Sequence, residues 1–225
     1  IFLAELEGLY VDDDPAQGVI EGPVFTHPDL KIQFRVPPGY LMSNASDAVT
    51  ITGSAGKAQF RQGPPDLDLS IAYAFRLLTR GQREIGYPAP RHLVINGMRV
   101  AATTTRVETD SGLIDASVVA YQWDPRRVYY FVMLTPGGYG IGPFVPMINS
   151  LRRITPAEAA AIRPRVIHVE TVREGDTVQS LSSRMAYPDF RLERFLSLNG
   201  LSANASLVPG ERVKLVVYGA RRSSN

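Results

Sequence analysis

The feature that most constrains this sequence is a stretch near the C-terminus in which the hydrophobic period changes from two to a helical spacing and back to two. Residues 168–173 alternate as a strand does, and Glu174-Gly175 forms a turn. Asp176 or Thr177 then starts a helix, because short oxygen side chains accept hydrogen bonds from the free N–H groups of a first helical turn. The stretch therefore opens with a strand followed by a helix.

Two helical faces and a second strand complete the stretch. Apolar residues spaced three or four apart form one face of each helix. They are Val178, Leu181 and Met185, and then Leu192, Phe195 and Leu196. Asn199-Gly200 ends the second helix, since these residues tolerate the left-handed backbone found at helix ends. Val213, Leu215 and Val217 then alternate as in a strand with one buried face.

This order of elements resembles the LysM family, whose pattern runs strand, Gly-Asp-Thr, helix, helix, Asn-Gly, Pro-Gly and strand. In LysM modules that bind glycan, the loop after the first strand and the loop between the second helix and the last strand contact N-acetylglucosamine units. Carried over residue by residue, the resemblance implies a glycan site. Its members are Gly175, Asp176, Thr177, Asn199, Gly200, Leu201, Leu207 and Pro209.

A purely structural explanation of the same residues stays open. Gly175 and Gly210 suit turns that require a positive φ, and Asp176 or Thr177 suits a helix cap. Residues 200–209 contain no Trp, Tyr or Phe on which a sugar ring could stack. The module is therefore either a glycan-binding domain or a packed docking domain.

Composition places the chain among ordinary globular proteins. Its 225 residues are 44% hydrophobic and 20% charged, enough for one large domain or two. There is no cysteine, which excludes disulfides, thiol catalysis and cysteine-zinc sites. No apolar run approaches the roughly 18 residues that a membrane-spanning helix needs.

Charge is unevenly distributed along the chain. Residues 1–150 carry 12 Lys and Arg against 15 Asp and Glu, whereas residues 151–225 carry 12 against 7. The basic end favours anionic polymers of the cell envelope over nucleic acid, because its arginines are dispersed and lack interleaved aromatic residues. The chain opens on Ile1 without a basic leader, so we expect it to be part of a longer precursor.

The remainder of the sequence predicts an α+β fold. Strands are expected at 30–36, 49–51, 58–60, 114–123 and 128–134, a hairpin at 92–107, and helices at 66–80 and 144–151. An antiparallel sheet flanked by helices is the simplest arrangement, and its element order resembles PsbP and Mog-type domains. The small strand-helix-helix-strand module follows it.

Four segments follow from these patterns. Residues 1–24 form a helix and a turn that belong to a preceding domain, with Asp12-Asp13-Asp14 as a solvated turn. Residues 25–154 form the α+β domain. Residues 155–165 form a capped helix and the linker, since Thr155 and Glu158 have the spacing of a capping box. Residues 166–225 form the LysM-like domain.

Several short motifs spread over nearly the whole chain resemble the region that follows the catalytic domain of bacterial HtpX/BepA-like zinc metallopeptidases. They are Gly8-Leu9, Asp13-Asp14-Pro15-Ala16-Gln17-Gly18, Phe25-Thr26-His27-Pro28-Asp29-Leu30, Val36-Pro37-Pro38-Gly39-Tyr40 and Ser150-Leu151-Arg152-Arg153. The resemblance implies that a zinc-dependent protease domain precedes this chain. Zinc is then expected in that absent domain.

The chain itself lacks a recognisable catalytic centre. A zinc peptidase needs His-Glu-x-x-His, but His27, His92 and His168 are isolated and fall outside any such motif. No Gly-x-Ser-x-Gly elbow occurs, and the glycines at 137–140 lack the Gly-Lys-Ser/Thr ending of a phosphate loop. Asp66 and Asp68 suit helix capping. We therefore expect no enzyme activity, no metal and no cofactor in this chain.

Two functions follow. The first is a non-catalytic accessory region that positions a zinc metalloprotease or its substrate in the periplasm or cell envelope, with the preceding protease domain as partner. The alternative is a free-standing peptidoglycan-binding or scaffolding protein. A self-contained hydrolase is a third option, which peptidase activity of the chain itself would reveal. Neither a nucleic acid nor a transmembrane segment enters any of these hypotheses.

Overall fold

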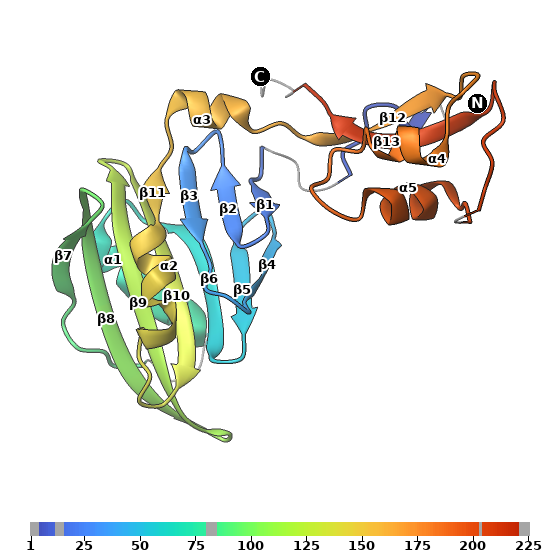
Figure 1. Ribbon diagram of the computed structural model, residues 1–225. Coiled ribbons are helices and arrows are strands. Elements are labelled where there is room, and N and C mark those ends of the chain that lie inside the picture. The colour runs from blue at the N-terminus through green and yellow to red at the C-terminus, as the bar shows by residue number, and fades with distance from the viewer. Residues whose placement is uncertain (1–4, 12–15, 80–84, 203, 221–225) are drawn as a thin grey trace. The chain divides into compact units, whose positions relative to one another are not determined.

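The computed structural model describes residues 5–11, 16–79, 85–202 and 204–220 (Figure 1). The chain divides into two compact units. The large unit comprises residues 17–159, and the small unit combines residues 1–16 with residues 160–225. The domain limits drawn from the sequence stay a prediction. The predicted turn at Asp12–Asp14 and the predicted helix end at Arg80-Gly81 lie outside the described residues.

The large unit is built on a seven-stranded antiparallel sheet with the order β4-β5-β6-β10-β9-β8-β7. Its strands are β4 (Leu41–Asn44), β5 (Val49–Gly53), β6 (Gly56–Gly63), β7 (Arg91–Ile95), β8 (Met98–Thr109), β9 (Gly112–Asp124) and β10 (Arg127–Pro136). The central strands β9 and β10 are buried along almost their whole length. Both of their faces therefore carry mostly apolar residues, unlike a sheet with one face exposed to solvent.

A second, four-stranded sheet has the order β1-β2-β3-β11. Its strands are β1 (Val19–Glu21), β2 (Val24–His27), β3 (Ile32–Arg35) and β11 (Arg152–Arg153). Phe25 and Phe34 from this sheet join Phe60 and Phe131 from the large sheet in one aromatic cluster, whose ring centroids lie 4.9–6.5 Å apart. The short helices η2 (Gly142–Phe144) and α2 (Val145–Ser150) close the same core.

The helix α1 (Leu67–Thr79) covers the other face of the large sheet (Figure 1). Ile71, Ala74 and Phe75 of this helix pack against alternate residues of β8, β9 and β10. The Asp66 carboxylate accepts a hydrogen bond of 2.9 Å from the N–H of Leu69, so it caps the helix as its position predicts. The large unit is thus a mixed α+β structure with antiparallel sheets, which confirms the predicted fold class.

The predicted hairpin turn at Asn96-Gly97 is present. Both residues have positive φ, 50° and 75°, as a two-residue turn of this kind requires. The Asn96 side chain also donates hydrogen bonds of 2.8 Å to the carbonyls of Asn149 and Leu151. The turn therefore fastens the end of α2 as well as reversing the chain.

The glycine-rich loop 137–140 is held by a buried carboxylate. Asp115 on β9 accepts hydrogen bonds from the N–H groups of Gly138 (2.7 Å) and Gly140 (2.9 Å) and from Arg106 (2.8 Å). The Arg106 guanidinium is the main reason that the pKa of Asp115 is lowered to about 2. The two loop N–H groups are thus engaged by protein, and the loop is no phosphate cradle.

The small unit contains α3 (Pro156–Ala161) at its boundary, β12 (Arg165–Thr171), α4 (Val178–Ser182), α5 (Arg191–Asn199) and β13 (Arg212–Tyr218). The strands β12 and β13 pair antiparallel. Phe195, Leu215 and Leu181 are almost fully buried between the helices and the strands. The capping box predicted for α3 is present. The Thr155 N–H donates to the Glu158 carboxylate at 2.7 Å, and the Glu158 N–H donates to the Thr155 hydroxyl at 3.1 Å.

The N-terminal segment pairs with the free edge of β12. The N–H of Gly8 donates to the Ile167 carbonyl and the N–H of Ile167 to the Leu9 carbonyl, both at 2.8 Å, and the N–H of Val11 reaches the Arg165 carbonyl at 3.1 Å. Residues 8–11 therefore pair antiparallel with the edge of the small sheet. This long-range pairing leaves no local sequence signal.

Candidate functional site

The structure brings two loops together at one end of the small sheet. We name residues 172–177 loop A and residues 207–211 loop B. The N–H of Val172 donates to the Glu211 carbonyl at 2.8 Å, and the N–H of Gly210 donates to the Val172 carbonyl at 2.9 Å. Because β12 and β13 are antiparallel, the end of the first strand meets the start of the second. Two parts of the predicted glycan site, at residues 175–177 and 207–209, therefore lie on adjoining loops, whereas Asn199, Gly200 and Leu201 lie outside both loops.

Loop A is shaped by its own side chains. The Asp176 carboxylate accepts a hydrogen bond of 2.8 Å from the Arg173 N–H, and the Asp176 N–H donates to the Arg173 carbonyl at 3.1 Å. Gly175 has a φ of 87°, which side-chain-bearing residues rarely adopt. The Thr177 hydroxyl accepts from the Ser180 N–H at 3.0 Å and caps α4. Gly175, Asp176 and Thr177, which were predicted to contact glycan, thus each contribute to the conformation of loop A or to the cap of α4.

Asn199 joins α5 to β13. Its side-chain amide donates to the carbonyls of Phe195 and Lys214, both at 2.9 Å, and its oxygen accepts from the Lys214 N–H at 2.7 Å. Gly200 follows with a φ of 64° at the helix C-cap, where the left-handed backbone ends α5. The Asn199 side chain is therefore fully engaged by protein.

The remaining predicted residues differ in exposure. Leu201 and Leu207 are half-buried and pack against the core of the small unit, whereas Pro209 is exposed. Val208 lies between Leu207 and Pro209, and its side chain is 54% exposed. It is not among the glycan-site residues predicted from the sequence. The sequence signal that could have indicated Val208 is an apolar residue directly before Pro209-Gly210, since a turn of this kind needs no apolar residue.

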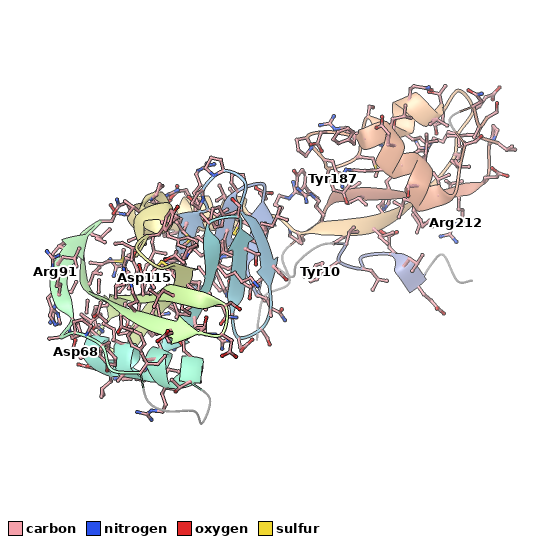
Figure 2. The ribbon with its side chains drawn as sticks, turned by 90° about the horizontal axis from the view of Figure 1, so that it is seen from below. Tyr10, Asp68, Arg91, Asp115, Tyr187 and Arg212 are labelled. Atoms are coloured by element: carbon pink, nitrogen blue, oxygen red, sulfur yellow. The ribbon has the colours of Figure 1, made fainter. Side chains whose placement is uncertain are left out.

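A second feature of the small unit lies away from the two loops. Arg165 and Arg194 stack on the ring of Tyr187, with guanidinium-to-ring distances of 4.9 and 4.2 Å. Figure 2 shows Tyr187 and Arg212, which starts β13 beside loop B, toward different ends of the unit. A shallow groove of about 390 Å³ lies next to Tyr187, between Val11 and α5. It is separate from the predicted glycan residues.

These loops and strands coincide with a known domain. Residues 171–216 match the LysM domain. The LysM domain includes all eight residues of the predicted glycan site together with Val208. It is a non-catalytic domain associated with binding to peptidoglycan and other carbohydrates, and it is typical of extracellular and cell-envelope proteins.

No curated protein matches the chain in sequence. The solved structures that are similar to it include the following two. A crystal structure of a protein from Bacteroides thetaiotaomicron VPI-5482 covers 90% of this chain and 88% of its own, with 10% identity and a TM-score of 0.44. The solution structure of cyanobacterial PsbP (CyanoP) from Synechocystis sp. PCC 6803 covers 61% of this chain and 98% of its own, with 11% identity and a TM-score of 0.45. At this level neither structure indicates a function.

The histidines have local partners. Nδ1 of His27 accepts a hydrogen bond of 3.3 Å from the Leu30 N–H. Nε2 of His92 lies 3.3 Å from Oδ1 of Asp68, and Nδ1 of His168 lies 2.9 Å from Oε1 of Glu7. Within the described ranges, no group of three or more His, Asp and Glu side chains could hold a metal ion. No described helix is long and apolar enough to cross a membrane.

Proposed function

We propose that this chain is a non-catalytic, peptidoglycan-binding component of the bacterial cell envelope. In this proposal the LysM domain contacts N-acetylglucosamine-containing glycan through loop A and loop B. The observation that carries it is the pair of hydrogen bonds that join Val172 to Gly210 and Glu211, since they unite two loops into one surface. The domain match to residues 171–216 supports the same conclusion.

The residues that contact sugar under this proposal differ from those that shape the loops. Because the side chains of Asp176, Thr177 and Asn199 already hold the backbone, the acetamido groups would meet backbone N–H and C=O groups of the loops. Val208 and Pro209 offer exposed apolar surface to the methyl groups and to the apolar face of the sugar. The surface lacks an aromatic platform, so we expect weak binding per module.

Charge supports an anionic envelope polymer as the partner. Residues 151–225 carry a net charge of +5, and the Arg173 side chain of loop A is 82% exposed. Exposed charges attract an oppositely charged polymer at low salt, and the attraction is screened as the ionic strength rises. We therefore expect retention on peptidoglycan to weaken with added salt without being abolished.

A pull-down of the full chain with insoluble peptidoglycan tests the proposal. Val208→Asp, which places a charge on the proposed contact surface, should abolish retention at low salt. The matched control is Val94→Asp, which changes a valine on the edge strand β7 that is 68% exposed, against 54% for Val208, and this variant should be retained like the wild type. Circular dichroism checks that both variants are folded. Failure of the wild-type chain to bind at low salt would contradict the proposal.

A second candidate is the accessory region of a zinc metalloprotease, with this chain positioning the protease or its substrate. The resemblance of several short motifs to HtpX/BepA-like peptidases motivates it. Reading the gene upstream of Ile1 tests this candidate: a His-Glu-x-x-His helix supports it, and its absence refutes it.

A further inference from the structure

The outer edge of β12 is covered by a short N-terminal segment, residues 7–11, which we name the strap. Three backbone hydrogen bonds of 2.8–3.1 Å join the strap to β12. Tyr10 of the strap, labelled in Figure 2, forms an antiparallel bridge with Val166. The Val169 N–H on the same edge donates to the Glu7 carboxylate at 2.7 Å instead of to a backbone carbonyl. The pairing therefore ends on a side chain that carries a charge.

The His168 ring lies between two carboxylates. Its Nδ1 is 2.9 Å from Oε1 of Glu7, and its Nε2 is 3.3 Å from Oε2 of Glu170. A protonated imidazole ring donates from both nitrogens, whereas a neutral ring donates from one nitrogen and has a lone pair on the other. Only the protonated ring can therefore donate to both carboxylates at once. A neutral ring faces one of the two with a lone pair.

The two carboxylates differ in how firmly other groups hold them. The Glu170 side chain is 11% exposed and accepts a second hydrogen bond, of 2.7 Å, from Arg184. The Glu7 side chain is 50% exposed, and its second hydrogen bond comes from a neutral backbone N–H. Three arginines complete the charged groups around this bridge: Arg173 of loop A and Arg184 after α4 face Glu170, and Arg212 of β13 acts on Glu7. Loss of the His168 proton therefore weakens mainly the hold on Glu7.

Apolar burial contributes little to holding the strap in place. None of its five residues is buried, and the Leu9 side chain is 47% exposed. Val11 is partly buried against the core of the small unit. A segment with few buried apolar contacts opens at a lower free-energy cost than the core of its domain. The strap can therefore leave β12 while the rest of the small unit stays folded.

We propose that the strap is a pH-sensitive cover of the β12 edge, which the protonated form of His168 holds closed. Glu7 is the main cause that raises the pKa of His168 above 6.5. As the pH rises through that pKa, the ring loses its charge and one of its two carboxylate contacts. The strap then opens more often and leaves the edge-facing groups of Arg165, Ile167 and Val169 unpaired. This cover belongs to the small unit and does not depend on glycan binding.

Amide hydrogen exchange of the full chain, measured by NMR at pH 5.5 and pH 8, tests the proposal. The exchange rate of the Ile167 N–H, divided by its intrinsic rate at each pH, measures the opening of the strap. We expect this opening to increase about three- to fivefold at pH 8, the effect of a partly exposed ion pair. The Val36 N–H, bonded to the Pro23 carbonyl in the large unit, should not change. Equal opening at both pH values overturns the proposal.

A comparison within the small unit shows whether the strap opens by itself. Leu215 of β13 is fully buried, so its N–H should exchange only when the small unit unfolds. The Ile167 N–H should exchange at least about tenfold faster than the Leu215 N–H, each relative to its intrinsic rate. Equal protection of the two amides would mean that the strap leaves only with global unfolding, and this result overturns the proposal.

Two histidine substitutions assign the pH effect to His168. His168→Gln keeps a side-chain donor but carries no charge at either pH, so the opening at Ile167 should be raised at pH 5.5 and should no longer change with pH. His92→Gln, at an exposed histidine beside Asp68 in the large unit, is the matched control and should behave like the wild type. A pH effect of unchanged size in His168→Gln overturns the proposal.

Discussion

The carboxylate of Glu7 lies 2.9 Å from Nδ1 of His168 and accepts a second hydrogen bond, of 2.7 Å, from the N–H of Val169. These partners are more than 160 residues apart in the chain, yet they belong to the same compact unit. The contact fastens the N-terminal segment to the edge of β12, next to the backbone pairing of Gly8 and Leu9 with Ile167. The contact lies outside residues 171–216 and belongs to the small unit that contains the LysM domain.

This contact predicts how the stability of the small unit depends on pH. The Val169 N–H and then His168 lower the pKa of Glu7 below 4.5, and Glu7 is the main cause that raises the pKa of His168 above 6.5. The Glu7 contribution is complete above pH 4.5 and is lost as the pH falls through its folded pKa. The His168 contribution is complete below pH 6.5 and is lost as the pH rises through its folded pKa. The contact is therefore strongest between pH 4.5 and 6.5.

Glu7→Gln should destabilise the small unit by about 1 kcal/mol at pH 5.5, because both groups are partly exposed and solvent weakens the ion pair. The effect should shrink at pH 8. Amide signals of β12 and β13 followed in urea measure it, since the single tryptophan, Trp123, reports on the large unit instead. Glu5→Gln, at an exposed neighbouring residue, is the matched control. An equal loss at both pH values would show that the ion pair contributes nothing.

Asn199→Ala should destabilise the small unit by about 2 kcal/mol, because it removes three hydrogen bonds and leaves the Lys214 N–H without its partner. Asn199→Asp retains the acceptor and loses both donor bonds, so it should fall between the alanine variant and the wild type. Chemical denaturation followed by the same amide signals gives the order. If Asn199→Ala had the same free energy of unfolding as the wild type, the Asn199 side chain would not be a stabilising link between α5 and β13.

Asp115→Asn should destabilise the large unit by about 2–3 kcal/mol, since one buried carboxylate holds Arg106 and the N–H groups of Gly138 and Gly140. Its pKa is lowered from 3.8 to about 2. The wild type should therefore lose this contribution as the pH falls from about 4 through 2. Trp123 lies on the same strand, so its fluorescence can follow unfolding. The free energy of unfolding of Asp115→Asn should vary less with pH than that of the wild type between about pH 4 and 2. An equal pH dependence in the two proteins would show that Asp115 does not make this contribution.

Thr177→Ala should destabilise the small unit by about 1 kcal/mol, because it removes the capping hydrogen bond to the Ser180 N–H. Thr177→Ser keeps a hydroxyl in the same place and should restore most of that stability. Retention on peptidoglycan, compared for the two variants, then separates capping from sugar contact. Full retention by Thr177→Ser indicates that Thr177 acts only as a cap.

Much of the local structure could be predicted from sequence. The turn at Asn96-Gly97, the cap at Asp66 and the box between Thr155 and Glu158 all depend on hydrogen bonds between residues three or four apart or on local backbone preference. The hydrophobic periods likewise identified α1 and the strand-helix-helix-strand order of the LysM domain. These signals are readable because the interactions that produce them are close in sequence.

Some boundaries were shifted by tertiary contacts. Met185 was predicted on the face of the first LysM helix, but α4 ends at Ser182. Met185 is buried all the same, with its sulfur accepting a hydrogen bond of 3.2 Å from the Val216 N–H. The predicted strand at 30–36 is shorter, Ile32–Arg35, because Lys31 has a φ of 58°. An apolar residue signals burial, and it does not by itself specify the backbone that carries it.

By itself, the sequence determined the secondary structure of the main elements, the α+β class and the LysM pattern, because each rests on periodicity or on a short motif. Only the tertiary structure decided that residues 8–11 pair with β12, that Asp115 holds the glycine-rich loop, and that loops A and B meet. These contacts join residues far apart in the chain, and their free energy depends on packing that no local pattern encodes.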